Sequence, residues 1–147
     1  MYDVSSFCKR LKELLGEREI TPDILASEIG YNEIYHWLSG KYMPSFNNLI
    51  KLANYFECSI DYLSGLTEFD CENHSTFIKQ CPSFSARLPF VIESCKSNIY
   101  RLSKESKIDR RTIYDWIEGQ YLPTLENLVK IASALKCSID YLVGRGE

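Results

Sequence analysis

The sequence predicts an all-α protein built from two tandem domains, each of about five short helices. Three observations carry this prediction. The chain resembles itself at a shift of 79 residues, apolar side chains recur at three- and four-residue spacing in both copies, and no segment shows the alternating pattern of a strand. A period this long exceeds the roughly 20–50 residues of stacking modules, so each copy is expected to be a complete folding unit.

The repeat is clearest in the C-terminal part of each copy. Residues 34–66 match residues 113–145, with 17 identities in 33 positions. Towards the N-terminus of each copy, the shift between the copies changes from 79 to 77 residues, which pairs Leu25 with Leu102. The first copy therefore lacks two residues between Leu25 and Ile34.

The segment between the copies sets the expected domain boundaries. It is polar, contains Pro82 and has no sustained hydrophobic period. We expect a first domain at residues 1–66, a linker at residues 67–83 and a second domain at residues 84–147. The linker's apolar side chains can pack on either neighbour; they are Phe69, Phe77 and Ile78.

Helix-capping residues mark where the helices begin. Thr21 followed by Pro22 is typical of a helix start, and Asn98 holds the matching place in the second copy. Later helices are expected to be capped by Ser45, Thr124, Ser59 and Ser138. Because proline removes a backbone hydrogen bond inside a helix, the first helix of the second copy is expected to begin at Pro89.

Residues 102–119, LSKESKIDRRTIYDWIEG, describe a helix, a short turn, a second helix and a glycine loop. Both copies also contain an FxxRL opening, a Gly-x-x-x-Pro loop and a SIDYLxG ending. In these features the chain resembles the Cro and lambda-repressor family of helix-turn-helix regulators, over nearly its whole length outside the linker. The resemblance implies two lambda-repressor-like DNA-binding domains, each with a recognition helix that enters the major groove.

The recognition helix of the second copy has a predictable orientation. Asp109 is expected to cap it, and Ile113 and Trp116, three residues apart, are expected to face the core. Trp116 and its counterpart Trp37 are expected to be buried between the recognition helix and the helices that follow it.

The resemblance assigns the base-contacting positions to Arg110, Arg111 and Asp115. Arginine can form two hydrogen bonds with guanine O6 and N7, and aspartate can accept one from cytosine N4. The alternative interpretation is that Arg110 and Arg111 lie on a solvated helix face and pair with Glu105 or Asp115.

Backbone contacts are expected around these positions. Five cations lie within the eleven residues 101–111, a plausible phosphate-binding rim. The candidate backbone contacts are Arg101, Lys104, Lys107, Thr112, Tyr114, Gln120 and Tyr121. One departure from the family pattern is Ile99, which stands where the family often has a phosphate-binding glutamine.

The first copy departs further from the family pattern. Glu33 stands where the second copy has arginines, and a glutamate there would point at a polyanion. Its weaker candidate contacts are Asn32, Tyr35, His36 and Lys41. The first copy either reads DNA weakly or is a protein-interaction domain.

The two halves of the chain differ in net charge. The net charge is −3, but residues 1–70 hold 6 Lys/Arg against 11 Asp/Glu, a net of −5, and residues 71–147 hold 11 against 9, a net of +2. We expect double-stranded DNA as the main partner of the basic half. A homodimer contact or a partner protein is the alternative use of the acidic half.

The sequence points away from other classes of function. It has neither a signal-peptide pattern nor a membrane span, which favours a cytoplasmic protein with reduced cysteines. Cys71, His74 and Cys81 could supply only three of the four ligands of a structural zinc site, so neither a metal nor another cofactor is expected. Neither a catalytic nucleophile motif nor a small-molecule site is evident, so we expect no enzyme.

Two functions from different classes remain. The first is a transcriptional regulator, most simply a repressor that occupies an operator. The second is an antirepressor or interaction module that keeps the fold and binds little DNA. A specific DNA complex should weaken steeply as salt rises, and that dependence separates the two.

Overall fold

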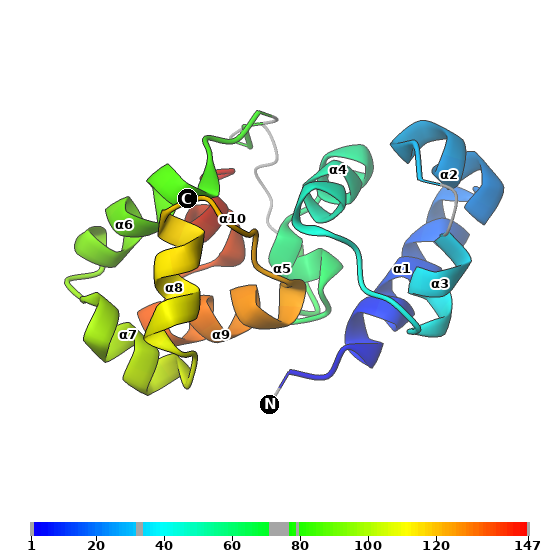
Figure 1. Cartoon of the computed structure of the whole chain (residues 1–147). Helices are drawn as coiled ribbons and strands as arrows, with labels where there is room; N and C mark the ends of the chain where they lie inside the picture. The colour runs from blue at the N-terminus through cyan, green and yellow to red at the C-terminus, as the bar shows by residue number, and fades with distance from the viewer. Residues whose placement is uncertain (1, 32–33, 71–76, 79, 147) are drawn as a thin grey trace. The chain divides into compact units, whose positions relative to one another are not determined.

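The computed structural model describes residues 2–31, 34–70, 77–78 and 80–146. Over those ranges it contains ten α-helices and no strand, which confirms the all-α prediction (Figure 1). The helices are α1 (Ser5–Arg18), α2 (Pro22–Ile29), α3 (Ile34–Ser39), α4 (Phe46–Phe56), α5 (Ile60–Leu63), α6 (Phe84–Ser94), α7 (Ile99–Ser106), α8 (Arg110–Ile117), α9 (Leu125–Leu135) and α10 (Ile139–Val143). Within the same ranges, none of them is long and apolar enough to cross a membrane.

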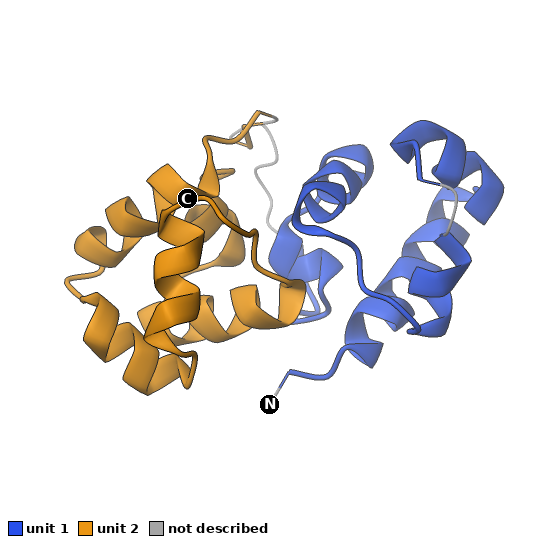
Figure 2. Cartoon of the chain, viewed as in Figure 1, with its two compact units in different colours: residues 1–74 blue, residues 75–147 orange. Residues whose placement is uncertain are grey.

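The chain divides into two compact units, residues 1–74 and residues 75–147, which we call the first and second domains (Figure 2). In the first domain α1 packs against α3 and α5, and α2 packs against α3 and α4. In the second domain α6 packs against α8 and α10, and α7 packs against α8 and α9. The five helices of each domain therefore follow the same packing pattern, as expected for a duplicated folding unit.

One guanidinium group joins the first helix of each domain to the last. Arg87 of α6 donates from Nε and Nη2 to the carbonyl oxygen of Tyr141 in α10, at 3.1 and 2.8 Å. Arg10 of α1 makes the same connection in the first domain, donating from Nη1 to the carbonyl oxygen of Tyr62 at 2.7 Å. Each guanidinium also lies over the tyrosine ring, 4.7 Å from the centroid for Arg87 and 3.9 Å for Arg10. In both domains the FxxRL and SIDYLxG segments therefore meet and join the first helix to the last.

The predicted helix caps are confirmed. Each capping side chain accepts a hydrogen bond from a backbone N–H in the first turn of its helix, which satisfies a donor that has no partner within the helix. These residues are Thr21, Ser45, Ser59, Asn98, Thr124 and Ser138.

The predicted start of a helix at Pro89 is wrong. α6 begins at Phe84, where the Ser83 hydroxyl accepts a hydrogen bond from the N–H of Ala86 at 3.4 Å, and the helix continues through Pro89. Pro89 lies on the exposed side of the helix. The opposite side is buried through Phe84, Leu88, Val91 and Ile92. Burial of these four side chains outweighs the one backbone hydrogen bond that proline removes.

The first residues of the predicted linker pack on the first domain. The carbonyl oxygen of Thr67 accepts a hydrogen bond from Arg10 Nη1 at 3.3 Å. The Asp70 carboxylate accepts one from the N–H of Ser59 at 3.0 Å, at the start of α5. Both contacts hold residues 67–70 against α1 and the start of α5.

The last residues of the predicted linker pack on the second domain. The N–H of Ile78 donates to the carbonyl oxygen of Arg145 at 2.7 Å. The Arg145 guanidinium lies 4.0 Å from the centroid of the Phe77 ring and pairs with Asp140 at 2.7 Å. Arg145 is only 1% exposed, and the Phe77 ring contributes to this burial.

Both tryptophans are buried, as expected, with exposed fractions of 1% for Trp37 and 3% for Trp116. Their described ring contacts come from residues that precede the recognition helix. Trp116 meets Phe84 of α6 edge to face, with ring centroids 6.3 Å apart. Trp37 stacks on Tyr31 at 4.6 Å.

Replacing Trp116 with alanine should lower the free energy of unfolding by about 3–5 kcal/mol, because a buried ring is removed and a cavity remains. Chemical denaturation followed by circular dichroism measures the change. A loss below about 1 kcal/mol would show that the indole is peripheral to the core.

Replacing Phe77 with alanine should cost about 1–2 kcal/mol, less than a fully buried phenylalanine, because the ring is half-buried over the Arg145–Asp140 pair. Phe69→Ala is the matched control, since that ring is 83% exposed and its loss should stay within about 0.5 kcal/mol. Equal effects of the two changes would mean that Phe77 is not part of the second domain.

Candidate nucleic-acid interface

The orientation of α8 follows from its two buried side chains. Ile113 and Trp116 lie in the core, as expected, so the other side of this eight-residue helix faces outward. Asp109 caps the helix as predicted, because its carboxylate accepts a hydrogen bond from the N–H of Arg111 at 3.2 Å. A short helix with a fixed start and a fixed buried side presents its remaining side chains in a defined direction.

The turn between α7 and α8 is held by side chains. The Ser103 hydroxyl donates to the carbonyl oxygen of Ile108 at 2.5 Å, and the N–H of Ile108 donates to the Ser106 hydroxyl at 3.3 Å. The Ile108 side chain is itself buried. Lys107 ends α7 with φ of 60°, a left-handed conformation that favours glycine. These contacts fix how α7 and α8 lie beside each other.

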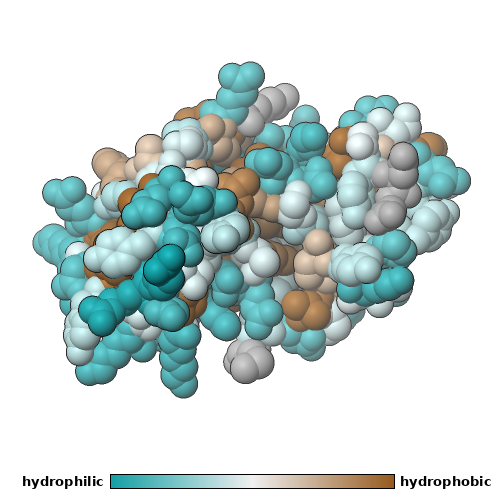
Figure 3. Space-filling model, in the orientation of Figure 1, coloured by the Kyte–Doolittle hydropathy of each residue, from teal (hydrophilic) through white to brown (hydrophobic). Residues whose placement is uncertain are grey.

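The outward side of α8 is hydrophilic (Figure 3). Arg110, Arg111 and Tyr114 are exposed, while Thr112 and Asp115 are half-buried. Arg111 Nε lies 3.7 Å from the Asp115 carboxylate, one helical turn away. Three of the five predicted contacts on α8, Arg110, Arg111 and Asp115, therefore carry a guanidinium or lie beside one.

The alternative pairing of the arginines is present only in part. Arg111 has the ion pair with Asp115, but the Arg111 side chain is 85% exposed, so this pair leaves its other donors open to solvent. Glu105 pairs with Arg101 at 2.8 Å and not with Arg110 or Arg111. The guanidinium of Arg110 instead lies 5.8 Å from the centroid of the Tyr100 ring.

Tyr100 is a residue that the sequence reasoning missed. It lies in the first turn of α7, and its ring approaches the start of α8 through Arg110. The available signal was helical spacing. Tyr100 and Lys104 are four residues apart and therefore share a side of α7, and Lys107 follows at the C-terminal end of the same helix.

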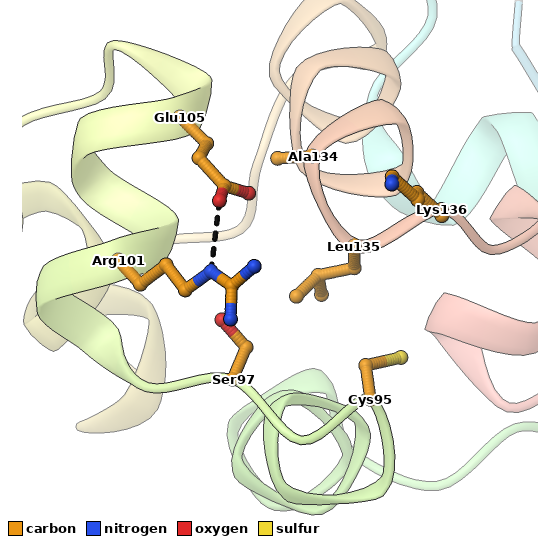
Figure 4. Close-up of a pocket in the computed structure, with 7 residues that line it drawn as sticks. All are labelled: Cys95, Ser97, Arg101, Glu105, Ala134, Leu135 and Lys136. Atoms are coloured by element: carbon orange, nitrogen blue, oxygen red, sulfur yellow. Dashed lines mark hydrogen bonds and ion pairs between the residues drawn. The ribbon is translucent and has the colours of Figure 1, made fainter.

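The predicted backbone contacts on α7 do not all lie together. Arg101 follows Tyr100 directly, so its side chain leaves the helix about 100° further round. It pairs with Glu105 and lines a hollow of about 310 Å³ together with Leu135 and Lys136 at the end of α9 (Figure 4). Lys104 and Lys107 are exposed and are not among the residues lining that hollow. Arg101 therefore belongs to a different surface from Tyr100.

Gln120 and Tyr121 are exposed in the loop that follows α8, beyond Gly119. They therefore stand at the opposite end of α8 from Arg110. Ile99, in the position of the family's glutamine, is half-buried at the start of α7.

The first domain presents a smaller aromatic group. Tyr35 is exposed on α3, and His36 meets Tyr42 edge to face with centroids 5.2 Å apart. The Lys41 ammonium lies 5.5 Å from the Tyr42 centroid. Tyr42 was not predicted, although it is the repeat counterpart of Tyr121 and could have been found from the alignment. The predicted contact Asn32, together with Glu33, lies outside the described residues.

The two helices that precede the recognition helices differ in charge. α2 and α7 have the same length and align at the 77-residue shift. Lys104 and Lys107 correspond to Ser27 and Gly30 of the first domain, and Tyr100 corresponds to Asp23. The surface that is basic and aromatic in the second domain is therefore neutral or acidic in the first.

Within the described part of the chain, no group of three or more side chains that could ligate a metal occurs. The Cys81 thiol donates to the carbonyl oxygen of Ile78 at 3.8 Å. Burial raises the pKa of the Cys81 thiol above its ordinary value. Cys71 and His74 lie outside the described residues.

Comparison with known protein families identifies both domains. Residues 8–67 match a family model described as a helix-turn-helix domain, and residues 96–142 match a second model described as helix-turn-helix. No match was found among the curated proteins or among the solved structures. With α2–α3 and α7–α8 in the expected places, the chain is a tandem helix-turn-helix DNA-binding regulator with two domains of the Cro and lambda-repressor type.

Proposed function

We propose that this protein is a sequence-specific repressor that inserts α8 of its second domain into the major groove of an operator. The observation that supports this proposal most directly is the first turn of α8. Arg110 and Arg111 are exposed there, while Ile113 and Trp116 hold the opposite side of the helix in the core. The N-terminal residues of a recognition helix are those that reach base edges in this fold.

Arg110 and Arg111 are the proposed readers of guanine, because a guanidinium can donate two hydrogen bonds to O6 and N7. Asp115 is proposed to accept from cytosine N4, and its half-buried carboxylate also lies beside Arg111. Repression then follows from occupancy of the operator, without any chemical step on the DNA.

Phosphate contacts are proposed to position the domain. Lys104 and Lys107 are exposed on the helix that crosses the backbone in this fold, and neither forms a described ion pair. Thr112 and Tyr114 flank the readers on α8. Gln120 and Tyr121 extend the contact at the far end of α8. Arg101 is the least well placed of the predicted set, since it is engaged with Glu105.

The first domain is proposed to contribute less. Its recognition helix has no arginine before Ile34, and α2 carries Asp23 and Glu28 without any lysine or arginine. Two unequal domains on one chain favour an asymmetric operator with half-sites about one helical turn, roughly 34 Å, apart. The second candidate function, a protein-interaction or antirepressor role, is favoured by the acidic charge of residues 1–70, and a cytoplasmic location suits both.

Selection of bound sequences from random duplex DNA tests the proposal. The purified chain should enrich an asymmetric sequence in which the more strongly selected half-site is rich in G·C pairs. Binding to this sequence should weaken steeply between low and moderate salt. The absence of any enrichment at low salt would remove the proposed function and leave the interaction role.

Alanine at Arg110 or Arg111 should each cost about 1–3 kcal/mol of binding free energy and relax selectivity at one base pair. Titration against the selected duplex and its single-base variants measures both effects. Lys51→Ala, a charge change on an exposed side of α4 in the first domain, is the control and should leave selectivity intact. Full retention of affinity and selectivity by the double arginine variant would contradict the assignment of α8.

Lys107→Gly should change stability and binding in opposite directions. Glycine adopts the left-handed conformation without strain, so the free energy of unfolding should rise by about 1 kcal/mol. Loss of the charge should weaken binding to all DNA sequences alike and lower the salt slope by about one unit. Denaturation and salt-dependent titration check the two effects, and unchanged binding would exclude Lys107 from the phosphate contacts.

A further inference from the structure

Tyr100 combines exposure with a specific neighbour. Its side chain is an exposed large aromatic, 64% open to solvent, on a helix whose other exposed residues are polar. The Arg110 guanidinium lies 5.8 Å from its ring centroid, within the range of a cation–π contact. The contact joins α7 to the first turn of α8, so it bridges the two helices of the helix-turn-helix unit.

This contact limits the freedom of the side chain that matters most for reading a base. An exposed arginine on a helix has many rotamers, and the pair of hydrogen bonds with guanine O6 and N7 requires one of them. A ring face that attracts the guanidinium restricts the accessible rotamers before DNA binds and lowers the entropy lost on binding. Arg111 has a carboxylate, Asp115, in the equivalent supporting place one turn away.

We propose that Tyr100 is a positioning and specificity-determining residue, whose ring holds Arg110 ready to contact its base pair. This inference rests on the proposed function of α8. The first domain offers a contrast, since Asp23 stands at the position of Tyr100. The second domain alone therefore has an aromatic support at this place.

The test measures base selectivity with three single variants and one double variant of the whole chain. Tyr100→Ala should reduce the preference for the base pair read by Arg110 by about two- to fivefold, the range expected for an exposed cation–π contact. Tyr100→Phe keeps the ring and should keep that preference. Arg110→Ala should abolish the preference, and adding Tyr100→Ala to it should cause no further loss, because both residues act through one interaction.

A matched control separates positioning from stability. Phe90 on α6 is also exposed and has the guanidinium of the half-buried Arg87 4.8 Å from its ring centroid, so Phe90→Ala removes an exposed ring beside an arginine that belongs to neither α7 nor α8. It should leave selectivity unchanged. All variants should keep the helical circular dichroism of the parent chain, since Tyr100 and Phe90 are both exposed.

The outcomes are distinguishable. Full selectivity in Tyr100→Ala, beside a clear loss in Arg110→Ala, would overturn the role of Tyr100 and leave the proposed function standing. Equal losses in Tyr100→Phe and Tyr100→Ala would overturn it as well, because they would assign the effect to the hydroxyl. Full selectivity in Arg110→Ala would show that the proposed function of Arg110 itself fails.

Discussion

The burial of Ile113 and Trp116 is the constraint on which the proposed interface depends. An isolated helix of eight residues is not stable in water, so α8 exists because these two side chains pack into the second domain. Their packing also fixes which residues of α8 face outward. The cap at Asp109 and the side-chain hydrogen bonds of the preceding turn then fix where the helix starts. The outward surface of this short helix is therefore a consequence of core packing.

Duplication has preserved the framework and changed the surface. Both domains close through an arginine of the first helix that binds the carbonyl oxygen of a tyrosine in the last, Arg10 with Tyr62 and Arg87 with Tyr141. The exposed positions follow no such constraint, because surface substitutions away from caps and cores change stability little. The second domain could therefore carry cations on α7 and α8 while the first became acidic, and the two halves can serve different roles within one fold.

Much of this organisation could be predicted from the sequence, because caps, apolar spacing and the repeat are local signals. The start of α6 could not be predicted from local signals. The missing N–H of Pro89 predicts a helix that begins at that residue, whereas burial of the opposite side of α6 lets the helix begin at Phe84. For residues 67–83 the sequence left open which domain the apolar side chains pack on, and the structure places Phe77 over the buried Arg145–Asp140 pair of the second domain. Helical spacing places Tyr100 on the same side of α7 as Lys104, but its contact with Arg110 joins two helices and is visible only in the structure.

We propose that most of the affinity for DNA resides in the second domain. Titration of two fragments, residues 1–70 and residues 76–147, against one selected duplex at several salt concentrations tests this most directly. The second fragment should retain most of the affinity and most of the salt dependence of the whole chain, and the first should bind weakly at every salt concentration. Binding of the first fragment as tight as that of the second would contradict the claim.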